Sequence, residues 1–311
     1  MSLTLAEIRA SLEDGLLSFP ITDLDKEGKF NADTYAARLD WFVTHKVSSV
    51  FVAGGTGEFF SLSENEYKKI VAVTAATVKE KIPMISSIGR SIPDAIAYAH
   101  IAEDAGMNAL LLMPPYLTEC PEDGTYEYAK TIMNNTNLPV IYYNRANGVL
   151  SSKYIQKLAD NCNNFIALKD GTGNIQELND TIKSVGNRLS YIGGVPTAEI
   201  IAEAYLSIGV NTYSSAAFNF VPDLANLFYS NLRAGNKENV AKILKEFFIP
   251  FVRLRSKKNG YAVSLIKAGA TIIGKSAGDV RAPLTMPLQE EIEVLEQLIE
   301  HAAKIVVAIK D

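Results

Sequence analysis

Cysteine and histidine are scarce in this chain, and their scarcity narrows the chemistry that the chain can hold. Its 311 residues include 2 cysteines, Cys120 and Cys162, and 3 histidines, His45, His100 and His301. The cysteines follow no motif spacing, so neither a disulfide framework nor a zinc site is expected. The histidines fall far apart in helix-like stretches without carboxylates at ligand spacing. We therefore expect them to pack or to face solvent, and we expect no metal.

Long apolar runs and an excess of basic residues are also missing. No segment approaches the uninterrupted run of about 20 apolar residues that a membrane helix needs. The N-terminal residues lack the charged and apolar regions of a signal peptide. The net charge of -5 at pH 7 offers no electrostatic attraction for nucleic acid or an anionic membrane. We therefore expect a soluble, cytoplasmic protein whose partner is a small molecule.

The chain instead alternates short apolar runs with longer amphipathic segments. Eight runs are typical of strands: 16–19, 49–53, 83–88, 109–113, 139–143, 165–168, 189–192 and 210–215. Helical patterns lie between them at 34–45, 63–81, 92–105, 126–135, 152–161, 175–185 and 197–208. This alternation predicts the α/β class, with a parallel sheet closed into a (β/α)8 TIM barrel. An open, doubly wound sheet is the alternative.

Beyond the eighth run the pattern becomes wholly helical. It covers 222–233, 237–257, 260–273 and 289–310, and no linker-like composition separates it from what precedes. We therefore expect a barrel over 1–221 and a C-terminal helical extension over 222–311, packed together as one structural unit. Residues 269–276 match a nucleotide-binding phosphate loop letter for letter. That loop needs a strand before it, whereas a helix precedes it here, so we expect a helix that stops at Gly274.

Lys169 is the most informative single residue, because it closes the apolar run 165–168 and is followed by a glycine turn. In barrels of this kind the active site lies at the carboxyl ends of the strands. Desolvation there favours the neutral amine, which can attack a carbonyl carbon. The local sequence is equally compatible with a lysine that snorkels to the strand end or pairs with Asp170.

Two other strand ends carry reactive or binding groups. The loop 54–58 presents backbone N–H groups of Gly55 and Thr56, a nest suited to a carboxylate or phosphate, although a tight turn alone also explains its glycines. Tyr143 could relay a proton or could be a strand aromatic with a backbone partner. Arg145 could clamp a carboxylate bidentately or lie solvated in its loop.

Three motifs together resemble the dihydrodipicolinate synthase and N-acetylneuraminate lyase superfamily in order and spacing. They are Gly55-Thr56-Gly57-Glu58, Tyr143-Asn144 and Ala167-Leu168-Lys169-Asp170. The resemblance implies a (β/α)8 barrel with a helical extension, usually tetrameric. It also implies that Lys169 forms a Schiff base with a 2-keto acid, with no metal or organic cofactor. Tyr143 would then transfer protons, and Gly55 and Thr56 would bind the carboxylate of the keto acid.

Departures from the synthase pattern make the chain most similar to the 5-dehydro-4-deoxyglucarate dehydratase branch of this superfamily. Gly55-Thr56 stands where the synthases have two threonines, and Leu117 stands where they have a tyrosine of the proton relay. Arg145 replaces a valine and adds a cation, which suits a substrate with a carboxylate at each end. Thr172 departs from the dehydratases, in which valine is usual; its hydroxyl could contact substrate or be inert.

We therefore expect a Schiff-base-forming lyase that dehydrates and decarboxylates a keto sugar acid, with Lys169 and Tyr143 as catalytic residues. The expected substrate contacts are Gly55, Thr56, Asn144, Arg145, Thr172, Ser214 and Ser215. The alternatives are a 2-keto-3-deoxy sugar-acid aldolase or a dihydrodipicolinate synthase-like lyase and, from another class, a non-catalytic sugar-acid-binding protein. We expect a homo-oligomer, either a tetramer or a dimer.

Overall fold

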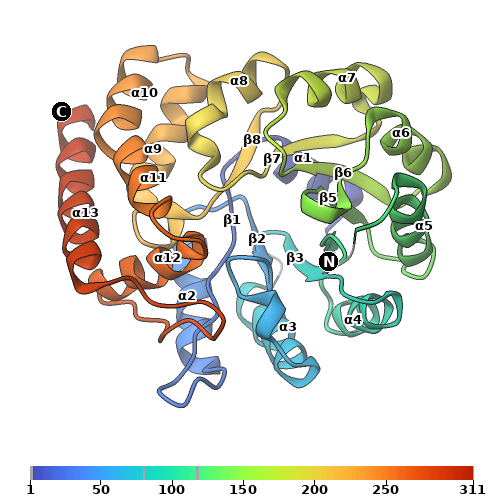
Figure 1. Cartoon of the computed structure of the whole chain (residues 1–311), viewed down its shortest axis with the longest axis horizontal. Helices are drawn as coiled ribbons and strands as arrows, with labels where there is room; N and C mark the ends of the chain where they lie inside the picture. The colour runs from blue at the N-terminus through green and yellow to red at the C-terminus, as the bar shows by residue number, and fades with distance from the viewer. Residues whose placement is uncertain (1–2, 80, 117–118, 311) are drawn as a thin grey trace.

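Eight parallel strands close into a barrel in the computed structural model, which describes residues 3–79, 81–116 and 119–310. The strands are β1 (Leu17–Ser18), β2 (Ser49–Val52), β3 (Met84–Ile88), β4 (Ala109–Leu112), β5 (Val140–Asn144), β6 (Phe165–Asp170), β7 (Ser190–Gly193) and β8 (Thr212–Ser215). Each strand pairs with the next, and β8 pairs with β1. Helices surround the barrel (Figure 1). The predicted (β/α)8 architecture is confirmed.

The helices of the barrel follow the predicted pattern closely, with differences at their ends. They are α1 (Leu5–Glu13), α2 (Ala32–Thr44), α3 (Glu64–Val78), α4 (Ile92–Asp104), α5 (Glu122–Met133), α6 (Ser152–Asn161), α7 (Ile175–Val185) and α8 (Ala202–Ser207). The predicted helix 197–208 divides into a 3₁₀ turn, Ala198–Ile201, and α8. Within the described residues, no helix is both long and apolar enough to cross a membrane.

Local signals explain where these helices begin. Ser63 and Glu66 form the capping box that opens α3, satisfying N–H groups that the first turn leaves unpaired. The helix α5 begins at Glu122, earlier than its apolar pattern indicates. Pro121 occupies its N-cap position and acidic residues fill its first turn, where they complement the helix dipole. The helix α1 was not predicted, and it begins with a second capping box, between Thr4 and Glu7.

The C-terminal extension is helical, as predicted. It comprises α9 (Pro222–Arg233), α10 (Lys237–Ile243), α11 (Ile249–Arg255), α12 (Tyr261–Ile272) and α13 (Gln289–Lys310). The predicted single helix 237–257 is interrupted by a π-helical turn, Leu244–Phe248, just before a proline in the first turn of α11. Proline lacks an N–H donor and crowds the preceding turn, so it favours such a break. In Figure 1, α13 runs along the outer side of α9 and α11.

The segment that resembles a phosphate loop ends a helix, as predicted. Gly274 takes a left-handed backbone conformation with φ of 74°. The N–H groups of Gly274 and Lys275 donate to the carbonyl oxygens of Thr271 and Ala270, at 3.0 and 2.8 Å. These bonds satisfy carbonyl groups that the last turn of α12 would otherwise leave unpaired. The segment therefore terminates α12.

Apolar side chains of the extension join the same buried cluster as those of the barrel. The rings of Phe220 and of Phe251 in α11 pack with centroids 5.6 Å apart. The ring of Phe220, which follows β8, lies so close to α12 that a Cβ on Gly269 would come within 2.7 Å of it. This close packing brings α11 and α12 over the barrel.

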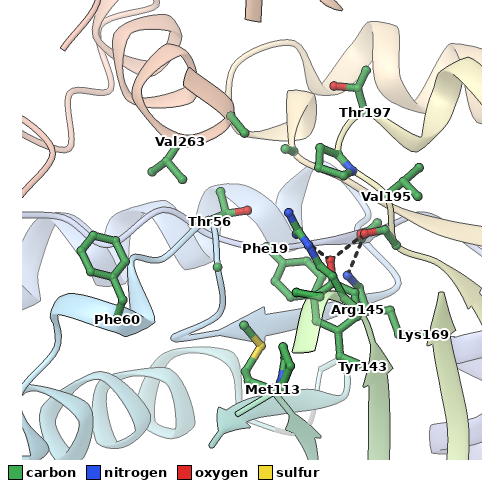
Figure 2. Close-up of a pocket in the computed structure, with 18 of the residues that line it drawn as sticks. Phe19, Thr56, Phe60, Met113, Tyr143, Arg145, Lys169, Val195, Thr197 and Val263 are labelled. Atoms are coloured by element: carbon green, nitrogen blue, oxygen red, sulfur yellow. Dashed lines mark hydrogen bonds between the residues drawn. The ribbon is translucent and has the colours of Figure 1, made fainter. Parts of the chain in front are cut away.

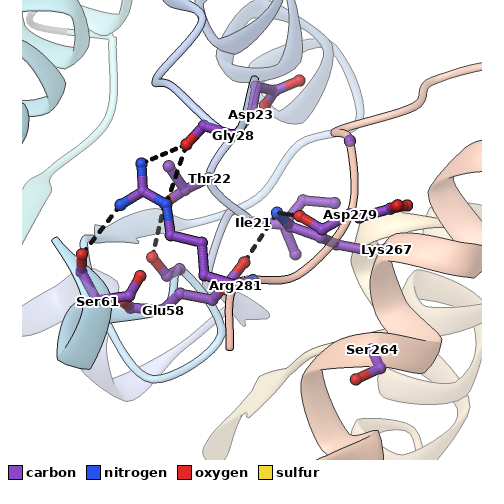
Figure 3. Close-up of polar contacts among 12 residues, drawn as sticks. Ile21, Thr22, Asp23, Gly28, Glu58, Ser61, Ser264, Lys267, Asp279 and Arg281 are labelled. Atoms are coloured by element: carbon purple, nitrogen blue, oxygen red, sulfur yellow. Dashed lines mark hydrogen bonds and ion pairs between the residues drawn. The ribbon is translucent and has the colours of Figure 1, made fainter. Parts of the chain in front are cut away.

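A buried ion pair also ties the extension to the loop after β2. The Glu58 carboxylate lies 2.8 Å from the Lys267 ammonium of α12, and both side chains are almost wholly buried. The second Glu58 oxygen accepts the backbone N–H of Arg281 at 2.8 Å, and Lys267 donates to the Asp279 carbonyl at 2.9 Å (Figure 3). Burial lowers the pKa of Lys267, and the Glu58 carboxylate opposes that effect. The loop 54–58 is thereby anchored to α12.

We predict that Lys267→Met destabilises the protein by about 3–5 kcal/mol, because it leaves the Glu58 carboxylate buried without its cation. Chemical denaturation at pH 7 measures the free energy of unfolding. The double variant Glu58→Gln, Lys267→Met should recover part of the loss, since no unpaired charge remains. A single variant within about 1 kcal/mol of wild type, against the expected loss, would contradict this account.

Candidate active site

Lys169 and Tyr143 are adjacent residues on neighbouring strands. Tyr143 of β5 pairs in register with Lys169 of β6, so both side chains point to the same side of the sheet. The strand β6 continues through Asp170, so Lys169 lies within the strand and not beyond its end. Both side chains are buried, with 3% of Lys169 and 5% of Tyr143 exposed. The amine is therefore desolvated and beside a phenol.

Aromatic rings and one carbonyl group surround the Lys169 amine (Figure 2). Its Nζ lies 3.6 Å from the ring centroid of Tyr143 and 4.9 Å from that of Phe19. It donates to the carbonyl oxygen of Gly194 at 3.4 Å, which is a long hydrogen bond. In the described part of the chain, no carboxylate lies within ion-pair distance of this amine. Its surroundings therefore offer ring faces and one carbonyl oxygen to a positive charge, but no carboxylate.

The Asp170 carboxylate is occupied elsewhere. One oxygen accepts the N–H and hydroxyl of Thr172 at 2.9 and 2.6 Å. The other accepts the N–H of Gly173 at 3.1 Å and the Tyr205 hydroxyl at 2.7 Å. Asp170 therefore organises the turn after β6, and the structure supports neither the pairing nor the snorkelling alternative for Lys169.

The ionisation of Lys169 and Tyr143 is coupled. Burial lowers the pKa of Lys169 below its ordinary value, although Tyr143 opposes the shift. Burial by itself raises the pKa of Tyr143, but the charges of Lys169 and Arg145 outweigh it and lower that pKa. The Tyr143 hydroxyl donates to the Gly194 carbonyl at 2.7 Å and accepts from Arg145 Nη1 at 3.0 Å. Burial and neighbouring charge thus place the pKa values of both side chains below their ordinary values.

Two glycines allow this close arrangement. A Cβ on Gly194 would lie 2.6 Å from Lys169 Cγ and 2.8 Å from its Nζ. A Cβ on Gly171 would lie 2.7 Å from both Tyr143 Cε2 and Arg145 Cβ. Sequence reasoning missed the role of Gly194, although the Gly-Gly pair directly after the seventh apolar run was a usable signal.

These residues open into a cavity of about 400 Å³ at the carboxyl ends of the strands, a size typical of small-molecule sites. Its walls include Phe19, Phe60, Met113, Tyr116, Val195 and Thr197 from the barrel, and Phe251, Arg255, Val263 and Ile266 from the extension (Figure 2). The extension therefore completes one side of the cavity. Leu117, expected to distinguish this chain from the synthases, lies outside the described residues.

The cavity brings most of the expected site residues together. Gly55, Thr56, Tyr143, Arg145, Lys169 and Ser214 line it, whereas Asn144, Thr172 and Ser215 do not. The Asn144 side chain instead bonds to Leu150, at the end of the loop that follows β5. Its amide oxygen accepts the Leu150 N–H at 2.7 Å, and its amide nitrogen donates to the Leu150 carbonyl at 3.2 Å. Ser215 donates to Glu199 at 2.5 Å. The placement of these last three residues does not support direct contact with a substrate.

The loop after β2 retains open donors. The backbone N–H groups of Gly55 and Thr56 have no acceptor among the described residues. A Cβ on Gly55 would meet nothing within 4 Å, so packing does not require glycine there. Because glycine has no side chain, it leaves room in the cavity. The Thr22 hydroxyl donates to the Gly57 carbonyl at 2.6 Å and steadies the loop.

The cavity is electropositive. Lys169, Arg145 and Arg255 line it, and no aspartate or glutamate does so in the described part of the chain. Open N–H groups on one side and cations on the other favour a negatively charged ligand. Fold and cavity together define a (β/α)8-barrel protein with a buried amine facing a cavity that is lined by two arginines.

The chain belongs to the dihydrodipicolinate synthetase family, which it matches over residues 13–302. It is 44% identical over 294 residues to the 5-dehydro-4-deoxyglucarate dehydratase of Pseudomonas putida, covering 94% of this chain and 97% of that protein. It is 46% identical, with the same coverage, to a protein of Allorhizobium ampelinum named "Probable 5-dehydro-4-deoxyglucarate dehydratase". The fold is shared with the dihydrodipicolinate synthase of Oceanobacillus iheyensis, at a TM-score of 0.88 and 23% identity over 96% of this chain and 99% of that one.

We predict that Gly194→Ala lowers catalytic turnover at least about 100-fold, because the added methyl displaces the Lys169 amine, the expected nucleophile, by roughly 1 Å. Steady-state kinetics measures the loss, and circular dichroism checks the fold. Gly124→Ala is the matched control: a Cβ at that α5 position meets only ordinary contacts, the nearest at 3.8 Å. Equal activity of the two variants would argue against a steric role for Gly194.

A second prediction concerns Glu199, whose carboxyl is buried beside Ser215. Burial raises its pKa from 4.5 to about 7, so its ionisation in the folded state costs stability as pH rises between these values. Glu199→Gln should therefore be more stable than wild type at pH 8, by roughly 1–3 kcal/mol, with the gap closing towards pH 4.

Thermal or chemical denaturation across that pH range measures the effect. Glu203→Gln, on the exposed face of α8, is the matched control and should show no such pH-dependent gain. A Glu199→Gln variant that loses equal stability at pH 4 and pH 8 would refute the titration argument.

Proposed function

We propose that this chain is a 5-dehydro-4-deoxyglucarate dehydratase. The reaction converts 5-dehydro-4-deoxy-D-glucarate to 2,5-dioxopentanoate, carbon dioxide and water. The observation that carries the proposal is a buried Lys169 amine beside Tyr143 in an electropositive cavity. Relatives of that name, 44 and 46% identical over nearly the whole chain, add support.

Lys169 acts as the nucleophile. Its neutral amine attacks the keto carbon, the carbonyl oxygen leaves as water, and an iminium forms. Tyr143, hydrogen-bonded to Arg145 and close to the amine, carries protons to and from this intermediate. The lysine iminium is itself the electron sink, so the proposed reaction uses no metal or organic cofactor.

The iminium then drives elimination. It withdraws electrons from the neighbouring methylene, which loses a proton, and the hydroxyl on the next carbon departs as water. The carboxylate attached to the imine carbon leaves as carbon dioxide, and the electron pair stays on that carbon as an ylide stabilised by the iminium nitrogen until a proton replaces the carboxylate. A proton shift from the remaining hydroxyl-bearing carbon to the new double bond converts that carbon to the second carbonyl group. Protonation and hydrolysis release the product and regenerate the Lys169 amine.

Opposite sides of the cavity bind the two ends of the substrate. The open N–H groups of Gly55 and Thr56 bind the carboxylate next to the keto group. Arg145 lies near the remaining carbon atoms of the substrate. The Ser214 hydroxyl, at the end of β8, lines the same cavity. A dicarboxylate suits this distribution of donors and cations better than a substrate with one charged end.

We further propose that the barrel and its helical extension work as one structural unit, since residues of both line the cavity. We also expect a cytoplasmic homo-oligomer, either a tetramer or a dimer, as the family resemblance implies. Light scattering of the purified protein would measure the oligomer.

Borohydride trapping tests the proposed function directly. Incubation with 5-dehydro-4-deoxyglucarate followed by reduction should leave a covalent adduct on Lys169, identified by peptide mass spectrometry. Lys169→Ala should form no adduct and lose nearly all turnover, because no other lysine of the described ranges lines the cavity. Tyr143→Phe should slow turnover by about 10²–10⁴-fold, the usual contribution of a proton-transfer group.

Lys68→Ala, at an exposed lysine of α3, is the matched control and should keep full activity. The products separate the remaining alternatives. Carbon dioxide release identifies the dehydratase, pyruvate release identifies an aldolase, and reversible binding without an adduct identifies a sugar-acid-binding protein.

A further inference from the structure

Arg255 is a cation of the cavity that belongs to the helical extension. It is the last residue of α11, and its guanidinium reaches the loop after β7. Its Nη1 donates to the Pro196 carbonyl at 2.7 Å and to the Thr197 hydroxyl at 2.5 Å. We propose that Arg255 is a specificity-determining residue, which binds with Arg145 the carboxylate farthest from the keto group. This assignment rests on the function proposed above.

The anchoring of Arg255 leaves a binding edge available. Only Nη1 is used by the protein; Nη2 and Nε have no acceptor among the described residues. The N–H bonds of these two nitrogens are parallel, and through such a pair a guanidinium binds both oxygens of a carboxylate. Because Thr197 and Pro196 hold the side chain in place, little conformational entropy is lost when an anion binds.

The charge around Arg255 is not balanced by the protein. Neither Arg255 nor Arg145 forms an ion pair with a carboxylate in the described ranges. The buried Glu199 is nearby, but burial raises its pKa to about 7, so it is an incomplete counter-ion near neutral pH. Burial lowers the pKa of Arg255, Glu199 opposes this, and the charge of Arg145 lowers it further. Two guanidinium groups that repel each other across a cavity are stabilised by an anion between them.

The barrel topology places this cation pair away from the Gly55–Thr56 nest. In the closed order β1 to β8, β2 stands across the barrel from β6, while β5 and β7 flank β6. The nest follows β2, whereas Arg145 follows β5 and the Arg255 anchor follows β7. A keto acid bound at Lys169 on β6 can therefore direct its near carboxylate to the nest. Its far end then lies beside the two arginines.

The test measures recognition of the far carboxylate separately from turnover. Purified full-length protein is titrated with 2-oxoadipate, a six-carbon keto acid with a carboxylate at each end, and with 2-oxohexanoate, which has a methyl group in place of the second carboxylate. Borohydride-trapped adduct is quantified at each concentration. Arg255→Gln should raise the half-saturating concentration of 2-oxoadipate by about 10- to 100-fold, the loss expected for a charge-assisted bidentate contact. The half-saturating concentration of 2-oxohexanoate should stay within about twofold of the wild-type value, because that ligand has no second carboxylate.

Two further variants make the result specific. Arg255→Lys keeps the charge without the planar guanidinium, so it should weaken 2-oxoadipate binding less than Arg255→Gln does. Arg253→Gln, two positions earlier on α11 and exposed, should change neither titration.

Equal weakening of both ligands, or no weakening of either, would overturn the assignment of Arg255. Trapping with these keto acids does not require dehydratase activity. Adducts that form and respond to Arg255, without carbon dioxide release from 5-dehydro-4-deoxyglucarate, would therefore refute the proposed function and leave this carboxylate site standing.

Discussion

The burial of one amine without a counter-charge is the constraint around which this molecule is arranged. Lys169 lies against the Tyr143 and Phe19 rings with a single carbonyl as its hydrogen-bond acceptor. The nearest carboxylate in sequence, Asp170, is held by the turn after β6 and by Tyr205. Because water and carboxylates are both kept away, the charged ammonium form is disfavoured, and the neutral amine needed for attack on a carbonyl becomes accessible at lower pH.

A second buried lysine shows how much the partner matters. Lys267 is as deeply buried as Lys169, yet its ammonium group meets the Glu58 carboxylate at 2.8 Å and the Asp279 carbonyl at 2.9 Å. Burial lowers the pKa of both amines, but only Lys267 has a carboxylate against it. A lysine held in this way anchors α12 to the loop after β2, whereas an unpaired lysine facing a cavity is suited to covalent chemistry.

Much of the architecture was predictable because the spacing of apolar residues along the sequence follows the side chains that are buried in each strand and helix. The eight apolar runs correspond to the eight strands, and helices such as α6 and α7 match their predicted bounds. The failures have physical causes. The helix α1 is short and lies before the first strand, so no alternating pattern marked it. Pro121 and the acidic first turn start α5 before its apolar stripe begins. The strand β6 runs through Lys169 and Asp170 because pairing with β5 and β7 continues past the apolar residues.

By itself, the sequence determined the barrel and the helical extension. It also determined which strand-end residues come together, namely Lys169, Tyr143, Gly55 and Thr56, because the carboxyl ends of the strands meet at one rim of the barrel whatever the details of packing. Tertiary structure alone decided the rest. It placed Arg255 of α11 in the same cavity as Arg145, and it directed Asn144, Thr172 and Ser215 to protein partners. It also made Gly194 the space that the Lys169 side chain needs. These outcomes depend on contacts between residues distant along the chain, which periodicity and motif spacing do not record.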